Sequence, residues 1–349
     1  SEGILLDASK VNNFEATYDL VKTMRASILV LGPLLARFKY AKVSLPGGCA
    51  IGARPIDIHI ENFKKMGAKI DLKSGYVEAS TDGLVGAKIV LRFPSVGATE
   101  NLLMASTLAK GTTIIENAAM EPEIDDLANY LNAMGGRISG IGSSTLNIIG
   151  VESLNPVEYM AIGDRVEAAT YLICALATNS EIRVKDFNPK HLDAVLSVLE
   201  NMGAKFKIGI DWIEVMKSEL KGVKISTAPF PGFPTDVQAQ LMALMALANG
   251  SSIITENIFE NRFMHVPELR RLGAEIELNG NSAVISGDSK YFGAPVMCTD
   301  LRASAALIIA GLAAKGPTEI SRIYHLERGY ENIEEKLRAL GAKIRRTNK

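Results

Sequence analysis

Hydrophobic positions along the chain follow two patterns, which together predict helices alternating with short strands. In residues 124–134 the apolar positions are spaced by three, four and three residues, which is typical of a helix with one buried face. In residues 76–79 and 212–215, apolar and polar side chains alternate as they do along a half-buried strand. Residues 240–249 and 303–314 are apolar or small almost throughout, which predicts helices that are buried on all sides.

These patterns recur as a sequence repeat. A Leu or Met followed by Gly and then by Ala or Gly occurs five times, and the first glycines are 68, 68, 70 and 68 residues apart. They are Gly67, Gly135, Gly203, Gly273 and Gly341. Each follows an amphipathic helix, so we expect each glycine just past a helix C-terminus with a left-handed backbone. The even spacing indicates repeated structural units of about 68 residues.

Each unit also predicts a second, more apolar helix. These helices are expected at residues 100–109, 165–177, 237–248 and 301–314. Because a helix that is apolar all round must be covered all round, several units are expected to share a helical core with sheets outside it. The sequence therefore predicts an inside-out α/β arrangement, unlike a Rossmann fold or a TIM barrel.

The repeat also suggests how the chain is divided. A boundary near residues 162–164 gives a first domain of residues 1–162 and a second domain of residues 163–349. Residues 1–10 align with the hairpin strand that follows the repeated glycine elsewhere, so the first unit is expected to be incomplete.

Composition and charge exclude several classes of protein. Hydrophobic residues make up 47% and charged residues 22%, and the net charge is −1, so nothing attracts the whole chain to nucleic acid or anionic membranes. The three cysteines and four histidines are scattered, which argues against a disulfide framework or a metal site. No apolar run reaches membrane-spanning length. Motifs for ATP hydrolysis, nicotinamide binding, metalloproteases and serine hydrolases are absent from the sequence. We therefore expect a cytoplasmic protein with reduced thiols and no cofactor.

Residues 46–55 (Pro-Gly-Gly-Cys-Ala-Ile-Gly-Ala-Arg-Pro) differ most from the scaffold. Three glycines between two prolines permit unusual backbone angles, so we expect Cys49 to be exposed on a mobile loop. The neighbouring Arg54 would stabilise a thiolate or bind an anion. A plain Gly-rich turn is the structural alternative. Cys174 and Cys298 lie in apolar runs and are expected in the core.

Aspartates mark the starts of four predicted helices. They are Asp19, Asp164, Asp236 and Asp300. Asp is an ordinary helix cap, and we expect capping to explain three of the four. Helix N-termini that face one cleft also suit anions. Residues 95–99 (Ser-Val-Gly-Ala-Thr) open another buried helix with small side chains, which leaves backbone N–H groups free for phosphate.

Arginines near these helix starts form a third candidate set: Arg25, Arg54, Arg302 and Arg328. An exposed arginine is usually only a solvated charge. Four at equivalent ends of repeated units indicate a convergent anion site, because the guanidinium group binds carboxylates and phosphates with two parallel hydrogen bonds.

Seven motifs give the chain a family resemblance. They are residues 19–27, 44–55, 95–99, 234–240, 259–265, 299–304 and 328–330. With these motifs the chain, from about Tyr18 to Lys343, resembles the UDP-N-acetylglucosamine 1-carboxyvinyltransferase family of enolpyruvyl transferases. The resemblance implies two inside-out α/β barrel domains of three similar units each. It also implies transfer of the enolpyruvyl group of phosphoenolpyruvate to the sugar 3-hydroxyl, with release of phosphate and without metal.

The resemblance further implies the roles of individual residues. Cys49 matches the proton donor, which also reacts with fosfomycin, and Asp236 matches the base or orienting group beside the sugar hydroxyl. The matches to the phosphoenolpyruvate site are Arg54, Arg302 and Arg328. The matches to the UDP-sugar site are Arg25, Arg54, Pro55, Ile56, Asp57, Ile58, Ser95, Val96, Gly97, Asp236, Ile258 and Phe259.

Departures from the family leave alternatives open. The family's N-terminal Lys-Asn pair has no counterpart in this sequence, so a non-catalytic paralogue is one alternative. An enzyme like 5-enolpyruvylshikimate-3-phosphate synthase is another, although the Cys49 loop and residues 259–265 argue against it. The expected partners are the two small-molecule substrates, with no nucleic acid or membrane, in a monomer or weak oligomer.

Overall fold

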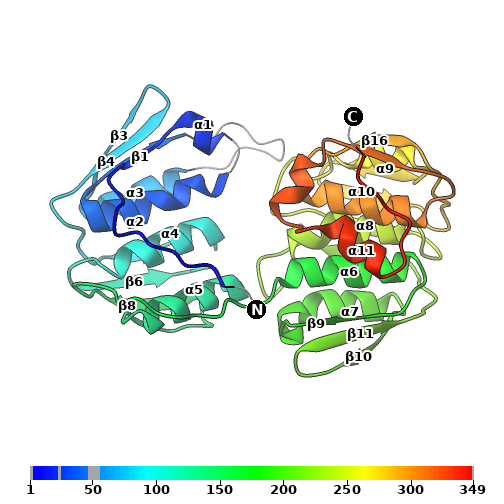
Figure 1. The fold of residues 1–349 in the computed structure, drawn as a ribbon, viewed down its shortest axis with the longest axis horizontal. Helices are drawn as coiled ribbons and strands as arrows, with labels where there is room; N and C mark the ends of the chain where they lie inside the picture. Colours follow the sequence, from blue (N-terminus) through cyan, green and yellow to red (C-terminus); the bar gives the residue numbers. More distant parts are fainter. Residues whose placement is uncertain (1–2, 23–24, 46–55, 348–349) are drawn as a thin grey trace. The chain divides into compact units, whose positions relative to one another are not determined.

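The chain folds into two compact units, shown in Figure 1. The computed structural model describes residues 3–22, 25–45 and 56–347, although the side chain of Arg25 lies outside this description. The first unit extends to Ala161 and the second begins at Ile162.

The first unit combines two four-stranded sheets with helices. Its strands are β1 (Glu15–Ala16), β2 (Tyr40–Ser44), β3 (Lys69–Lys73), β4 (Tyr76–Ser80), β5 (Lys88–Val90), β6 (Thr112–Glu116), β7 (Arg137–Ser139) and β8 (Thr145–Ile149). Its helices are α1 (Tyr18–Val21), the 3₁₀ helix η1 (Arg25–Val30), α2 (Leu31–Phe38), α3 (Asp57–Lys65), α4 (Val96–Ser106) and α5 (Pro122–Ala133). The strand orders are β1-β2-β4-β3 and β5-β6-β8-β7, and in each sheet the first two strands are parallel and the others antiparallel.

Helix α4 forms the centre of the first unit's core. It packs against α2, α3 and α5 and also touches strands β6 and β8. Leu102 and Leu103 are completely buried, and so is the polar Asn101 between them and the start of the helix. Ser95 caps the helix by accepting a hydrogen bond from the backbone N–H of Ala98 at 3.3 Å.

The second unit has sheets of three, four and two strands. Its strands are β9 (Ile182–Lys185), β10 (Lys205–Ile208), β11 (Trp212–Met216), β12 (Lys224–Ser226), β13 (Ser252–Thr255), β14 (Ile276–Asn279), β15 (Ser282–Ile285), β16 (Pro295–Met297) and β17 (Glu319–Ser321). Its helices are α6 (Arg165–Ala177), η2 (Pro189–Leu192), α7 (Asp193–Asn201), η3 (Thr235–Val237), α8 (Gln238–Met245), α9 (Val266–Arg271), α10 (Leu301–Ala313), η4 (Ile323–Arg328) and α11 (Ile333–Ala339). The strand orders are β10-β11-β9, β12-β13-β15-β14 and β16-β17.

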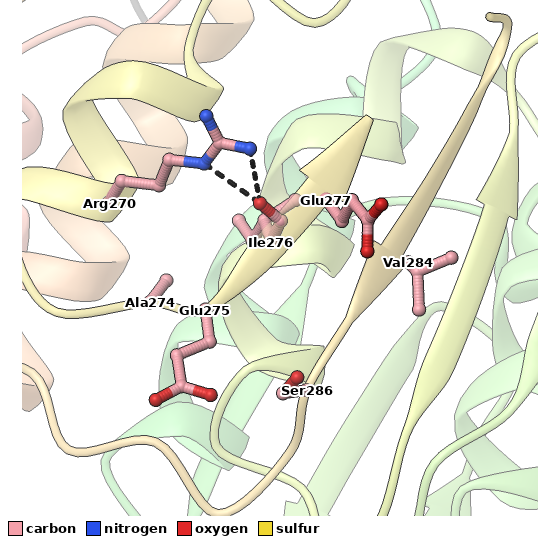
Figure 2. A pocket seen from close by; sticks show the side chains of 7 residues that line it. All are labelled: Arg270, Ala274, Glu275, Ile276, Glu277, Val284 and Ser286. Carbon is pink, nitrogen blue, oxygen red and sulfur yellow. Dashed lines mark hydrogen bonds between the residues drawn. The ribbon is translucent and has the colours of Figure 1, made fainter. Parts of the chain in front are cut away.

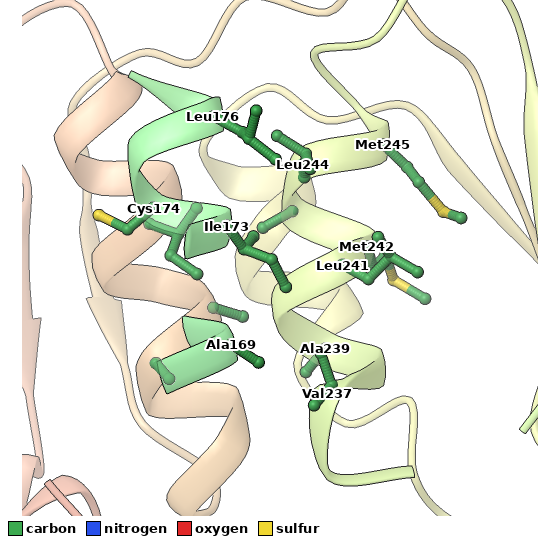
Figure 3. Packing of buried hydrophobic residues seen from close by; sticks show 14 of the residues in the cluster. Ala169, Ile173, Cys174, Leu176, Val237, Ala239, Leu241, Met242, Leu244 and Met245 are labelled. Atoms are coloured by element: carbon green, nitrogen blue, oxygen red, sulfur yellow. The ribbon is translucent and has the colours of Figure 1, made fainter. Parts of the chain in front are cut away.

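Three apolar helices form the core of the second unit. Helices α6, α8 and α10 contact one another, while α6 also touches β11 and α8 touches β13. Figure 3 shows Ile173 and Leu176 of α6 lying beside Leu241 and Leu244 of α8. Every residue of α8 is buried, as expected of a helix without a polar face. The predicted burial of these three helices is therefore confirmed.

The five repeated glycines have the predicted backbone. Their φ angles are +90°, +102°, +104°, +107° and +98° in chain order. The residue after each glycine donates a backbone hydrogen bond to the last turn of the preceding helix, as Ala68 does to Phe63 and Ala204 to Leu199. This arrangement is a Schellman motif, which satisfies carbonyl groups that the helix end leaves unpaired.

The strand pairings of the described residues leave each sheet open, so they form no closed barrel. Residues 3–10 form no strand, so the expected hairpin strand is absent there, and the first strand among the described residues is β1, which pairs with β2. Among the described residues, no helix has both the length and the apolar character needed to cross a membrane.

Candidate functional site

Asp236 lies between two arginines in the second unit. Its carboxylate is 43% exposed and belongs to η3, just before the buried helix α8. The Nη2 of Arg262 donates to its Oδ1 at 2.6 Å, and the Nη2 of Arg302 lies 3.5 Å from its Oδ2. Arg262 is only 3% exposed and Arg302 14%. Two nearly buried cations therefore stabilise the negative charge of one accessible carboxylate.

Hydrogen bonds from neighbouring helices hold this group in place. The Nη1 of Arg302 donates to the hydroxyl of Tyr330 at 3.3 Å, and that hydroxyl lies 2.9 Å from the Oγ1 of Thr170. The Nε2 of Gln240 lies within hydrogen-bond distance of both hydroxyls and of the Asp236 carbonyl oxygen, at 3.2, 3.3 and 2.9 Å. These side chains come from α6, α8, α10 and the segment after η4, so tertiary packing alone brings them together.

The charge state of Arg302 reflects two opposing effects. Burial lowers the pKa of its guanidinium group, whereas the charge of Asp236 and the hydroxyl of Tyr330 raise it, and the net shift is upward. Arg302 is therefore a permanent cation. Such a group at the start of a helix is suited to binding a phosphate or a carboxylate.

Asp300 and His265 lie beside the arginine pair. Asp300 caps α10 by accepting hydrogen bonds from the backbone N–H groups of Arg302 and Ala303, at 2.9 and 3.1 Å. His265, 1% exposed, is the N-cap residue of α9. Burial lowers the pKa of His265 to about 4, with the Arg262 charge acting in the same direction and Asp300 opposing it. The imidazole ring is therefore neutral at physiological pH.

The predicted residues Ile258, Phe259 and Arg328 also belong to the second unit. Ile258 and Phe259 follow strand β13 and are partly buried, and the guanidinium of Arg262 lies 5.4 Å from the centre of the Phe259 ring. Arg328 is exposed and ends η4, two residues before Tyr330. Burial and the charges of Arg322 and Arg328 lower the pKa of His325 in the same helix.

The first unit brings two predicted segments together at the starts of α3 and α4. Ile56 and Asp57 begin α3, and the carboxylate of Asp57 lies 2.5 Å from the Nη2 of Arg92, which precedes α4. Gly97 is in the first turn of α4, where an added Cβ would lie 3.9 Å from the ring of His59. The segments 56–58 and 95–97 are thus neighbours, as a shared ligand would require.

His59 is held behind these segments by a buried amide. The Nδ2 of Asn101 lies 3.1 Å from the Nδ1 of His59 and donates to the carbonyl oxygen of Ile28 at 3.0 Å. The Oδ1 of Asn101 accepts from the backbone N–H of Gly32 at 2.7 Å. Since the amide group donates to Nδ1, the ring carries its proton on Nε2. Burial lowers the pKa of His59 to about 4, which agrees with a neutral ring.

Several predicted site residues lie outside the described part of the chain. They are Cys49, Arg54 and Pro55, together with the side chain of Arg25. Their roles stay predictions. The other two cysteines, Cys174 and Cys298, are buried as expected. Burial raises the pKa of Cys174 to about 12, so its thiol is not a nucleophile at neutral pH.

The four aspartates at predicted helix starts differ in their hydrogen-bond and ion-pair partners. Asp164 and Asp300 are helix caps, since each accepts two backbone hydrogen bonds from the following turn. Asp19 lies within α1 and pairs with Lys22. Asp236 lies within η3 and faces the two arginines. Capping hydrogen bonds therefore explain Asp164 and Asp300, and Asp19 lies in the first turn of α1, where a carboxylate is stabilised by the helix dipole.

A surface hollow on the second unit contains none of the predicted residues. Figure 2 shows this surface hollow of about 310 Å³ over strands β14 and β15, near Val284. Arg270 at its edge donates to the backbone carbonyl oxygen of Ile276, with its Nε at 2.8 Å. This hydrogen bond joins α9 to β14, so Arg270 has a structural role at the edge of the hollow.

The sequence-based assignment missed three side chains of the Asp236 group. Arg262 and Tyr330 lie within the motifs 259–265 and 328–330, and Gln240 ends the motif 234–240, but none was given a role. Their partners are up to 160 residues away in the chain, so spacing could not pair them. A buried position for an arginine was the one available signal, since Arg is rarely buried unless it is paired.

A comparison with known protein families identifies the class. Residues 2–337 match the family model described as EPSP synthase (3-phosphoshikimate 1-carboxyvinyltransferase). The chain therefore belongs to this family of enolpyruvyl transferases.

Individual relatives narrow the class further. The protein named UDP-N-acetylglucosamine 1-carboxyvinyltransferase of Pseudoalteromonas atlantica is 58% identical over 344 residues, which cover 98% of this chain and 82% of the relative. The protein of the same name from Geotalea uraniireducens is 57% identical, with the same shares covered.

Solved structures agree with the fold. The enolpyruvyl transferase NikO from Streptomyces tendae superposes with a TM-score of 0.86 at 29% identity, over 97% of this chain and 81% of that chain. EPSP synthase from Acinetobacter baumannii gives a TM-score of 0.72 at 20% identity, over 94% of this chain and 79% of that chain. The second likeness concerns the fold alone.

Proposed function

We propose that this protein transfers the enolpyruvyl group of phosphoenolpyruvate to the 3-hydroxyl of UDP-N-acetylglucosamine and releases phosphate, the first committed step of peptidoglycan synthesis. The observation that carries this proposal is the Asp236 carboxylate between Arg262 and Arg302, in a chain 58% identical to an enzyme of that name. The EPSP synthase alternative is disfavoured, because the EPSP synthase from Acinetobacter baumannii is only 20% identical.

The reaction makes defined demands on the site. The sugar oxygen attacks C2 of phosphoenolpyruvate while C3 gains a proton, which gives a tetrahedral intermediate. The C2–O bond to phosphate then breaks as C3 loses a proton. A carboxylate must accept or orient the hydroxyl proton, an acid must protonate C3, and cations must bind the phosphate and carboxylate groups.

Asp236 is suited to the first demand. Its carboxylate is accessible, and its position is set by Arg262 and by the Gln240 bond to its own carbonyl oxygen. Arg302, a permanent cation at the start of α10, is suited to bind phosphoenolpyruvate together with Arg54 and Arg328. Cys49 is proposed as the acid that protonates C3.

The residues proposed to contact the UDP-sugar are those that the family resemblance indicates. In the first unit these are Arg25, residues 54–58 and residues 95–97; in the second they are Asp236, Ile258 and Phe259. The first turn of α4 offers backbone N–H groups and small side chains near Gly97, which suit a diphosphate.

Finer features of the proposal rest on the family resemblance. They are inside-out barrels in two domains of residues 1–162 and 163–349, a cytoplasmic location, no cofactor or metal, no nucleic-acid or membrane partner, and a monomer or weak oligomer.

Release of phosphate tests the proposal. The protein is incubated with phosphoenolpyruvate and UDP-N-acetylglucosamine, and in parallel with shikimate 3-phosphate as the acceptor. We expect phosphate only with the UDP-sugar. No release with either acceptor contradicts the enzymatic proposal, and release only with shikimate 3-phosphate supports the alternative.

Matched variants test the assigned residues. Asp236→Asn is expected to lower kcat by roughly 10²–10⁴-fold, the usual loss when a general base is removed. Asp82→Asn, at an exposed turn, is the control. Fosfomycin is expected to add its mass to Cys49 and not to the buried Cys174, so mass spectrometry of the Cys49→Ser variant should find no adduct.

A further inference from the structure

Glu256 is a buried carboxylate with hydrogen-bond donors from three segments of the second unit. It follows strand β13, and its side chain is in a residue only 3% exposed. Its Oε1 accepts from the Oγ1 of Thr227 at 2.9 Å and from the backbone N–H groups of Ile258 and Phe259 at 2.8 and 3.2 Å. Its Oε2 accepts from the Oγ1 of Thr235 at 2.9 Å.

We call Glu256, Thr227, Thr235, Ile258 and Phe259 the Glu256 cluster. In this cluster, hydrogen-bond donors rather than a cation stabilise the buried carboxylate. Within the described residues, no ion pair involves Glu256. A buried carboxylate is costly unless it accepts hydrogen bonds, and it accepts four here, three on Oε1 and one on Oε2. Replacement by an apolar residue would leave two backbone N–H groups and two hydroxyls without their acceptor.

Three members of the cluster bear directly on the substrate site. Thr235 immediately precedes Asp236 in η3. Ile258 and Phe259 are the turn proposed to contact the UDP-sugar. One carboxylate thus fixes the distance between that turn and the segment that carries Asp236.

A second connection joins the same segments. The guanidinium of Arg262 lies over the Phe259 ring and donates to Asp236 at 2.6 Å. Asp236 and Phe259 are therefore linked by two routes, one through Thr235 and Glu256 and one through Arg262. Both routes lie within a single unit.

We propose that Glu256 is a positioning residue for the UDP-sugar: it sets the separation of Asp236 from the Ile258–Phe259 turn without touching the substrate. This inference rests on the proposed function. It extends that function by naming a residue outside the assigned site on which sugar binding depends.

The expected kinetic effect is selective. In Glu256→Ala the turn and η3 lose their shared acceptor, so we expect the KM for the UDP-sugar to rise at least about tenfold and kcat to fall roughly 10–100-fold. The KM for phosphoenolpyruvate should change less than about threefold, because the hydrogen bonds of Glu256 go to Thr227, Thr235 and the 258–259 turn and not to Arg302 or Arg328. In Glu256→Gln the Oε1 can still accept three of the four bonds, and the hydroxyl of Thr235 can rotate to accept from Nε2. That variant should recover most of the sugar affinity.

A control separates positioning from stability. Glu268 is another nearly buried carboxylate of this unit, and it accepts from the backbone N–H of Met297 at 3.1 Å. Glu268→Ala is expected to lower Tm without changing the ratio of the two KM values. If Glu256→Ala fails to fold, Thr235→Val removes only the Oε2 donor and should raise the KM for the sugar several-fold.

Two measurements test the positioning role of Glu256. Steady-state kinetics with each substrate varied in turn overturn the proposal if both KM values rise together, or if Glu256→Gln loses as much as Glu256→Ala. Hydrogen exchange of the Ile258 and Phe259 amides is measured without substrate. Faster exchange in Glu256→Ala than in Glu256→Gln supports the positioning role even if the wild-type protein uses another substrate, and equal exchange overturns it.

Discussion

Glu100 makes the stability of the first unit depend on pH near neutrality. It lies in the second turn of α4 and faces Glu121 and Glu123 at the start of α5. Burial raises the pKa of Glu100 to about 7, and the two neighbouring carboxylates act in the same direction. We predict that Glu100→Gln, which resembles the protonated form, stabilises the protein in alkaline solution only.

The magnitude follows from the pKa difference between the folded and unfolded states. Below pH 4.5 both states hold the proton of Glu100, so the group has no effect on stability. Between pH 4.5 and 7 the unfolded state loses its proton first, and stability falls as pH rises. A shift from 4.5 to about 7 corresponds to about 3 kcal/mol, of which about 2.5 kcal/mol is lost between pH 5 and 8.5.

Thermal unfolding at these two pH values measures the effect. The gain in Tm from Glu100→Gln should be larger at pH 8.5 than at pH 5 by roughly 5–10 °C. Glu61→Gln, at an exposed position of α3, is the control and should show no such difference. A gain of the same size at both pH values would refute the burial argument.

Three further predictions concern other parts of the chain. Asp236→Ala is expected to cost about 3 kcal/mol in the free energy of unfolding, because it leaves the buried Arg262 without its closest partner. Adding Arg262→Met to the same chain should restore most of that loss. Denaturant unfolding of the single and double variants measures both effects, and additive losses would contradict the reasoning. The low pKa of His59, about 4, predicts that about 3 kcal/mol is lost as pH falls from 6.5 to 4, and an acid titration of His59→Gln should lack that loss. Gly150→Ala is expected to cost about 3 kcal/mol by thermal unfolding, because its Cβ would lie 1.6 Å from the Ala109 carbonyl oxygen; an unchanged Tm would show that the backbone can move.

Part of the candidate site was predictable because its residues are neighbours in the chain. Asp236, Phe259 and residues 95–97 lie within local motifs, and Ile258 and residues 56–58 directly adjoin such motifs. The structure adds the reasons for their geometry. Glu256 follows a strand with nothing in the local pattern to distinguish it, yet it accepts four hydrogen bonds from segments up to 29 residues away.

Charge roles were less predictable than helix positions. An aspartate at a helix start has the same local pattern whether it caps the helix or pairs with a distant arginine. Asp300 caps α10, whereas Asp236 faces Arg262, 26 residues further along the chain. Which of the two occurs depends on what packs against the helix start, and that is a tertiary property.

The sequence by itself determined the repeated local structure. A positive φ favours glycine so strongly that five evenly spaced glycines mark five helix ends, and helices without a polar face must be buried. The tertiary structure decided which polar groups meet inside that scaffold. Arg262, Tyr330 and Glu256 have no local signature, because the free energy that holds them depends on partners far away in the chain.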